Sequence, residues 1–200
     1  MGALAGRTAL VTGASRGIGA AIARIFGLTG ARVALVARTR PAIEAIAMEI
    51  GNGAVVVEAD LRDVAGTQAA ARAVLEAFGS PPDIVVNNAG VFDVVLAHEM
   101  EAEALSRMID TNLLAPMVLL RELLPGMRAR GSGHVVSIGS IADRATFAGN
   151  AGYSATKFAM RAVHQVVRDE TRGTGVRATL VSPAGVNTDI WEPIRFPGAA

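Results

Sequence analysis

The sequence predicts an α/β fold in which helices cover both faces of a parallel sheet. Short apolar runs of four to six residues alternate with longer amphipathic segments, which is typical of buried parallel strands joined by crossover helices. A glycine-rich turn follows the first run, and polar or glycine residues follow the later ones. Because the carboxyl ends of parallel strands share one edge of the sheet, we expect the ligand-binding loops there.

The elements can be placed in order from these patterns. Strands are expected at residues 7–12, 32–37, 54–59, 83–86, 134–138 and 176–181. Helices are expected from the glycine turn to about residue 29, and at 41–50, 62–78, 101–130 and 152–172. Pro41 suits the first turn of its helix, whereas Pro125 predicts a kink or an end within residues 101–130.

Composition limits the classes of protein to consider. The chain has 200 residues, 51% of them apolar, which suits one domain over residues 1–200. Its apolar runs stay far below the ~18 residues that span a bilayer. A net charge of +1, with both signs interspersed, gives no electrostatic case for a nucleic-acid or membrane partner.

Cysteine and histidine speak against two further kinds of chemistry. The chain has no Cys, so neither disulfides nor thiolate catalysis is expected. His98, His134 and His164 are scattered, so no metal site is expected. The first residues show no charged segment followed by an apolar stretch and a cleavage site, which predicts a cytoplasmic protein.

Tyr153 and Lys157 are the sole tyrosine and the sole lysine, and they stand four residues apart. On a helix this spacing puts both side chains on one face. A phenol ionises near pH ~10, and a neighbouring ammonium lowers its pKa by stabilising the phenolate. The pair is therefore a candidate for proton transfer. The alternative is a half-buried core tyrosine beside a surface lysine.

Gly13, Gly17 and Gly19 form the turn between the first strand and the first helix. Glycine lets the backbone approach a phosphate, and a helix N-terminus offers unpaired N–H groups and the positive end of its dipole. This placement predicts a dinucleotide site, although a plain tight turn would also account for the glycines.

Several motifs occur together in one order along the chain. They are Thr12 with the glycine turn, Asn87-Asn88-Ala89-Gly90, Asn112, Ser140 and the Tyr153/Lys157 pair. Over about residues 5–190 the chain thereby resembles the short-chain dehydrogenase/reductase family, in particular its compact single-domain branch, which includes 3-oxoacyl carrier-protein reductases. The resemblance implies a Rossmann-like doubly wound sheet with the strand order 3-2-1-4-5-6. Family members continue past the end of this sequence, so their seventh strand is not expected here.

The resemblance also implies catalytic roles. Tyr153 would be the general acid for ketone reduction, and Lys157 would hold the nicotinamide ribose and lower the pKa of Tyr153. Ser140 would hydrogen-bond the substrate oxygen, and Asn112 would support a water that relays protons to Lys157. Taken alone, Ser140 could be a strand-end turn residue and Asn112 a cap at a helix kink.

A further set of residues is assigned to the cofactor by the same resemblance. The set is Gly13, Ser15, Arg16, Gly17, Ile18, Gly19, Arg38, Asp60, Leu61, Asn88, Ala89, Gly90, Tyr153, Lys157, Pro183, Val186 and Thr188. Asp60 and Leu61 would bracket the adenine ring, with an N-cap of the next helix as the alternative for Asp60. Ala184 departs from the family's Pro-Gly, and its methyl group stands where the backbone would approach the nicotinamide.

The end of the second strand favours NADP(H) over NAD(H). An NAD site usually has an acid there for the ribose 2′-hydroxyl, but this chain has Ala37, and the next acid along the chain is Glu44. Arg38 follows at once, and Arg16 lies in the bordering glycine turn. Two guanidinium groups suit a 2′-phosphate; the alternative is that they are ordinary surface arginines.

Expectations for the substrate pocket and for assembly follow from the same resemblance. The pocket is expected to be open on one side and lined by Val91, Phe92, Ile141, Ala142 and Trp191. The helices near 101–130 and 152–172 carry more apolar residues than one sheet face can cover, and in the family they pair between subunits. We therefore expect a homodimer or homotetramer.

The leading hypothesis for function is an NADP(H)-dependent carbonyl reductase or alcohol dehydrogenase that acts on a small molecule, with the 3-oxoacyl type as one candidate. The rival hypothesis is a nucleotide-binding regulatory or interaction protein of the same fold with little turnover. A nucleotide-sugar epimerase is a third, weaker alternative. Nothing in the sequence identifies the substrate or the direction of the reaction.

Overall fold

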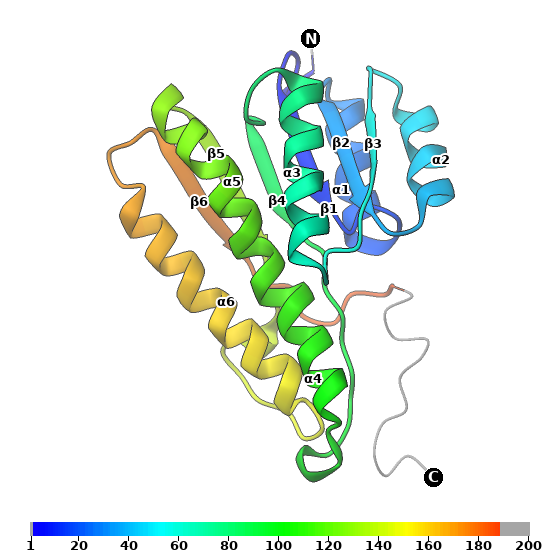
Figure 1. The fold of residues 1–200 in the computed structure, drawn as a ribbon, viewed down its shortest axis with the longest axis vertical. Helices are drawn as coiled ribbons and strands as arrows, with labels where there is room; N and C mark the ends of the chain where they lie inside the picture. Colours follow the sequence, from blue (N-terminus) through cyan, green and yellow to red (C-terminus); the bar gives the residue numbers. More distant parts are fainter. Residues whose placement is uncertain (1, 189–200) are drawn as a thin grey trace.

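The computed structural model describes residues 2–188, and they form a six-stranded parallel sheet between two layers of helices (Figure 1). The strands are β1 (Thr8–Thr12), β2 (Arg32–Ala37), β3 (Val55–Glu58), β4 (Ile84–Asn87), β5 (Gly133–Ile138) and β6 (Val176–Val181). Their order is β3-β2-β1-β4-β5-β6, as predicted from the sequence. Since the order turns back between β1 and β4, the loops after these two strands flank a crevice.

Residues 2–188 form six α-helices, and helices cover both faces of the sheet. They are α1 (Gly17–Leu28), α2 (Arg40–Ile50), α3 (Val64–Phe78), α4 (Ala102–Ile109), α5 (Ala115–Arg130) and α6 (Ala151–Glu170). Apolar side chains of α3, α5 and α6 pack with Leu10 and Val85 on one face. Side chains of α1 and α2 pack with Val11 and Val86 on the other. Successive strand residues thus bury opposite faces, which explains the unbroken apolar runs.

The start of α3 corrects one expectation. Asp63 is its N-cap, and its carboxylate accepts hydrogen bonds from the backbone N–H groups of Ala65 at 3.2 Å and Gly66 at 2.8 Å. The helix therefore begins at Val64 rather than at residue 62, and the suggested N-cap role of Asp60 is wrong. The Asp60 side chain instead accepts from the N–H of Arg62 at 3.0 Å.

Residues 101–130 form two helices joined by a π-helical turn, Asp110–Leu114 (η2). A π turn carries one more residue than an α turn, and such turns are frequent at functional sites. This one contains Asn112, so the helical run is interrupted there rather than at Pro125, where a kink or an end was predicted. Pro125 does not end α5, which continues to Arg130 while Leu123 and Met127 on either side of it are fully buried in the core.

Two expectations, a cytoplasmic location and the absence of a metal site, remain predictions. No helix among residues 2–188 is both long and apolar enough to cross a bilayer, and a cytoplasmic location remains a prediction. No three His, Asp or Glu side chains in that part of the chain gather as metal ligands.

Trp191, expected in the substrate pocket, lies outside the described residues.

Candidate active site

A cavity of about 1030 Å³ opens at the carboxyl edge of the sheet, lined by loops that follow all six strands. The predicted site residues that line it are Gly13, Ser15, Arg16, Gly17, Ile18, Arg38, Asp60, Leu61, Asn88, Ala89, Gly90, Ser140, Tyr153, Lys157, Pro183, Val186 and Thr188. Gly19 and Asn112 are the two predicted residues that lie behind its wall instead. The topology thus brings together residues that are up to 175 positions apart, from Gly13 to Thr188.

The glycine turn is built for close backbone approach. Gly13 and Gly17 have φ values of +64° and +54°, which an L side chain rarely adopts. A Cβ on Gly19 would lie 2.3 Å from the carbonyl oxygen of Gly13, so the start of α1 can pack there only without a side chain. Gly17 and Ile18, the first residues of α1, line the cavity, and the helix N-terminus therefore borders it, a position that favours an anionic group.

Thr12 and Asn88 lock the ends of β1 and β4 together. The Thr12 hydroxyl donates to the carbonyl of Val86 at 3.2 Å and accepts from the N–H groups of Asn88 and Ala89, both at 3.0 Å. The Asn88 amide donates to the carbonyls of Thr12 at 2.8 Å and Gly13 at 3.3 Å. These bonds hold the Asn-Ala-Gly segment against the glycine turn.

The end of β2 presents Ala37 and Arg38 to the cavity. The Arg40 side chain is paired with an acid, because its Nε donates to Glu44 at 2.7 Å in an i,i+4 ion pair. Glu44 is the next acid along the chain, but the sheet brings a second acid to this strand end. Parallel pairing places Glu58 of β3 in register with Ala37 of β2.

Asp60 lines the same end of the cavity as a paired carboxylate. Arg62 Nε lies 2.9 Å from one of its oxygens, and Arg62 also lines the cavity. Hydrogen bonds from Arg62 hold the pKa of Asp60 below its usual value, and the charge of Arg38 adds to this. This carboxylate at the cavity edge is therefore already paired with an arginine.

Tyr153 lies in the first turn of α6, stacked edge-on against Phe92 with ring centroids 4.6 Å apart. Burial raises the pKa of Tyr153 above its ordinary value, and a hydrogen bond with Ser140 opposes this only in part. The expected lowering of the pKa by Lys157 is wrong for the protein alone. The Lys157 Nζ lies 5.5 Å from the centre of the phenol ring, and burial also weakens its own charge.

Lys157 is almost fully buried, with 6% of its surface exposed. Its Nζ donates to the carbonyl of Ile138, at the end of β5, at 3.0 Å. Burial lowers the pKa of Lys157 to about 8. The side chain is thus held at the cavity wall by one backbone oxygen.

Ser140 begins the 3-10 turn Ile141–Asp143 (η3), directly after β5. Its Oγ accepts from the N–H of Ala142 at 3.2 Å, so it does serve as a turn residue. It also lines the cavity with Tyr153, where its hydroxyl partly opposes the rise in the pKa of Tyr153. The two roles suggested by the sequence are compatible, because a hydroxyl oxygen has two lone pairs and a donor.

Asn112 acts as a clasp on the loop after β4. Its Oδ1 accepts from the N–H of Val91 at 2.8 Å, while its Nδ2 donates to the Val91 carbonyl at 2.9 Å and to Thr156 Oγ1 at 3.1 Å. The side chain is 2% exposed and does not line the cavity. It therefore ties the π turn to α6 and to the loop that carries Gly90.

The loop after β6 closes the opposite side of the cavity. The carbonyl of Pro183 accepts from the N–H of Ile141 at 2.9 Å, which joins this loop to the Ser140 turn. Ala184 lines the cavity, and a Cβ on Gly17 would lie 3.4 Å from the Thr188 methyl group. The predicted pocket residues Val91, Phe92, Ile141 and Ala142 line the same region, together with Phe147.

Comparison with known proteins identifies the family. The sequence profile of the short chain dehydrogenases matches residues 7–196, nearly the whole chain. The chain belongs to the short-chain dehydrogenase family.

Two curated relatives from this family illustrate the range of lengths. A glycine betaine reductase of Emericella nidulans is 40% identical over 192 residues, covering 94% of this chain but only 15% of that protein. An NADP-dependent 3-hydroxy acid dehydrogenase of Salmonella typhi is 35% identical over 190 residues, covering 94% of this chain and 76% of its own length.

Solved structures of short-chain dehydrogenases superpose closely on the chain. A metagenomic short-chain oxidoreductase in complex with NADP has a TM-score of 0.86 at 41% identity, covering 90% of this chain and 83% of its own. A 3-ketoacyl-(acyl-carrier-protein) reductase from Brucella melitensis, complexed with NADH, has a TM-score of 0.91 at 30% identity, covering 96% and 81%. These likenesses confirm the predicted fold and the predicted family, and they are compatible with the predicted relation to 3-oxoacyl reductases.

Sequence reasoning missed several residues of this short-chain dehydrogenase site. Arg62, Thr111, Phe147 and Asn150 line the cavity, and Asp143 lies buried directly beside Ser140. Arg62 could have been found from its place next to Asp60 at a strand end. The other four stand in loops or in the π turn, where no periodicity indicates which side chain points inward.

Proposed function

We propose that the chain is an NADP(H)-dependent oxidoreductase that transfers a hydride between the nicotinamide and a small-molecule ketone or secondary alcohol. The observation that carries the proposal is the convergence of Ser140, Tyr153 and Lys157 on one cavity with the glycine turn and Arg38. Its size and lining suit a dinucleotide: close backbone approach at Gly13, a helix N-terminus, and guanidinium groups at the far end.

The chain's own residues would divide the work of ketone reduction. Reduced nicotinamide, when bound, supplies the hydride that the carbonyl carbon receives. Tyr153 gives its phenolic proton to the carbonyl oxygen, and Ser140 donates a hydrogen bond to the same oxygen as negative charge develops on it. Lys157 holds the cofactor's ribose hydroxyls. Asn112 would act indirectly, by holding in place the loop that carries Val91.

Several finer points belong to the same proposal. The apolar lining by Val91, Phe92, Ile141 and Phe147 favours a substrate with an apolar group beside the carbonyl. The NADP complex of the metagenomic relative and the name of the Salmonella typhi relative support NADP(H), whereas the Brucella melitensis complex holds NADH. A 3-oxoacyl substrate, a homodimer or homotetramer, and a cytoplasmic location are part of the proposal.

The direct test is NADPH oxidation, followed by absorbance, against a panel of ketones that includes 3-oxoacyl thioesters. We expect turnover with at least one apolar ketone. Tight NADPH binding without turnover on any ketone would favour the rival function, a nucleotide-binding protein that regulates or docks.

Cofactor choice is tested at Arg38. Losing a charged hydrogen bond costs roughly 1.5–3 kcal/mol, so Arg38→Ala should weaken NADPH binding by about one to two orders of magnitude and leave NADH binding nearly unchanged. Fluorescence titrations of wild type and variant with both nucleotides measure this. Arg40→Ala, at an arginine that pairs with Glu44, is the matched control and should bind NADPH like wild type. Equal losses for the two nucleotides, or tighter NADH binding by the wild type, would contradict the assignment.

A further inference from the structure

Asp143 is a fully buried carboxylate directly behind the candidate catalytic residues. It ends the 3-10 turn that begins at Ser140, and side chains from three directions converge on it. Arg144 Nε donates to its Oδ1 at 2.8 Å, the Ser182 hydroxyl after β6 donates to its Oδ2, and Arg161 Nη1 of α6 lies 3.9 Å from its Oδ1. The carboxylate therefore connects three elements: the loop after β5, the loop after β6 and helix α6.

The surroundings keep this carboxylate ionised. Burial by itself raises the pKa of Asp143, but hydrogen bonds from Arg144, Ser182 and the N–H of Ser140 hold it below its ordinary value. A buried charge is tolerated only when it is paired and hydrogen-bonded, and removal of its partners is costly. At neutral pH the site thus contains a fixed negative charge that no predicted catalytic role uses.

That charge has two routes to the reacting groups. The first is mechanical: the N–H of Ser140 donates to Asp143 at 3.4 Å, so the carboxylate orients the turn that carries the Ser140 hydroxyl. The second is electrostatic: the negative charge disfavours loss of a proton from both Tyr153 and Lys157 on the facing helix. The charged and titratable groups around Asp143 are Arg144, Arg161, Tyr153 and Lys157.

We propose that Asp143 is a positioning residue, which holds the Ser140 turn in place and disfavours ionisation of the Tyr153 phenol across the turn. The kinetic part of this inference rests on the proposed function, since only a reductase needs a protonated Tyr153. The proton-binding part does not, because it concerns the protein alone.

The chain allows a direct test without activity. Tyr153 is the sole tyrosine, so the phenolate absorbance in the near ultraviolet reports its ionisation alone. Asp143→Asn keeps the shape and removes the charge, and it should lower the pH midpoint of this titration by roughly half a unit or more. Circular dichroism at each pH confirms that the chain is folded. Asp143→Ser removes the same charge with a smaller side chain, if the amide at 143 does not fold.

Two control variants separate the charge from other effects. Asp169→Asn removes a charge from α6, the helix that carries Tyr153 and Lys157. Asp169 is exposed and lies roughly 18 Å along the helix axis from Lys157, so this variant should leave the midpoint unchanged. Ser182→Ala removes one donor to Asp143 and keeps the charge, and should also leave it unchanged. A midpoint in Asp143→Asn equal to that of wild type would overturn the inference. A shift in Ser182→Ala as large as that in Asp143→Asn would overturn it too, because the cause would then be a disturbed loop.

The kinetic counterpart uses the ketone that the wild type reduces best. The rate of reduction should fall at high pH as Tyr153 loses its proton, and in Asp143→Asn this descending limb should move to lower pH by the same amount. The ascending limb of alcohol oxidation should move in the same direction. Loss of turnover with an unmoved limb would contradict the proposal. Absence of turnover in the wild type would refute the proposed function and leave the titration result standing.

Discussion

Tyr153 is the residue on which the proposed chemistry depends most directly. Tyr153→Phe removes one hydroxyl and keeps the edge-on packing against Phe92. It should lower turnover at least ~100-fold, the low end for a positioned general acid, with NADPH affinity nearly intact. Steady-state kinetics and a nucleotide titration on the same preparation measure both. A variant that retains most of the wild-type turnover would show that another group supplies the proton.

Lys157 is held in the site at a cost in stability. Its pKa in the folded chain is about 8, against 10.5 for the free group, so the unfolded chain binds more protons between these values. Stability therefore rises with pH from about 8 to 10.5, and the full penalty, about 3 kcal/mol, is present below pH 8.

Lys157→Met should consequently raise the free energy of unfolding at pH 7, less the lost hydrogen bond to Ile138, while it removes activity. The gain should shrink above pH 8 and vanish toward pH 10.5, in urea unfolding without nucleotide. Arg168→Met, at an exposed residue of the same helix, should show no such dependence on pH. A gain that is constant across this range would contradict the assigned pKa.

At the scale of elements, the π turn between α4 and α5 contributes both to the stability of the fold and to the position of the loop at the site. Asn112→Ala removes the clasp on Val91 and Thr156 and leaves buried backbone groups unpaired. We expect a loss of about 2–4 kcal/mol in urea unfolding, together with reduced turnover. Ser106→Ala, one turn earlier and exposed, should cost less than about 0.5 kcal/mol. If both variants unfold alike, the clasp is unimportant for stability.

Element positions followed from the sequence to within two residues, because apolar period and Gly or Pro punctuation mark them. The π turn did not, since its residues Asp110–Leu114 differ in nothing local from an α-helix. The start of α3 was placed too early because two acids, Asp60 and Asp63, could each have been the cap. The motif residues predicted the cavity, whereas Asp143 acts through contacts with Ser182 and Arg161 that only the fold creates.

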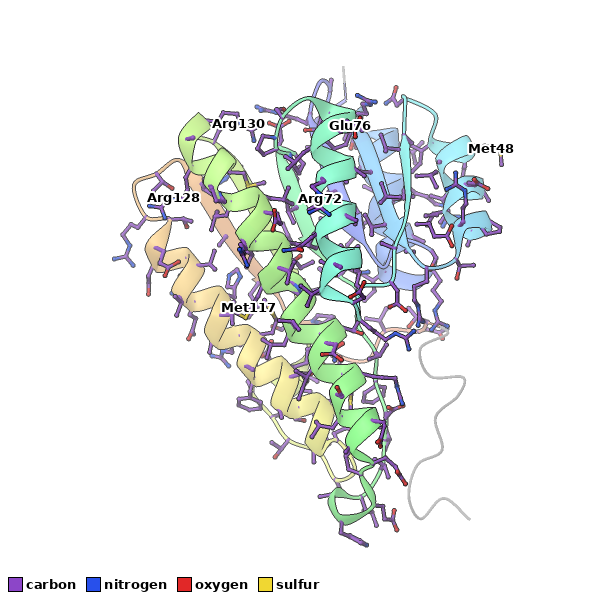
Figure 2. The ribbon with its side chains drawn as sticks, in the orientation of Figure 1. Met48, Arg72, Glu76, Met117, Arg128 and Arg130 are labelled. Carbon is purple, nitrogen blue, oxygen red and sulfur yellow. The ribbon has the colours of Figure 1, made fainter. Side chains whose placement is uncertain are left out.

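At the scale of the whole molecule, apolar side chains remain exposed on the helices that were expected to pair. Met117 of α5 is 46% exposed and Phe158 of α6 is 42% exposed. We expect the wild type to sediment as a homodimer or larger at micromolar concentration, and Met117→Glu to sediment as a monomer. Met48→Glu is the control, because Met48 is 79% exposed on α2, at the outer edge of the molecule (Figure 2). A stable wild-type monomer would rule out the predicted assembly.

The burial of Lys157 also shapes how the chain meets amine-directed reagents. Since it is the sole lysine and lines the cavity, the surface formed by residues 2–188 presents a lysine amine only inside that cavity. Acylating labels and lysine cross-linkers therefore have one buried target besides the amino terminus. A bound nucleotide would shield that target, so the mass added to each chain by a brief acylation pulse would count the fraction of sites that are filled.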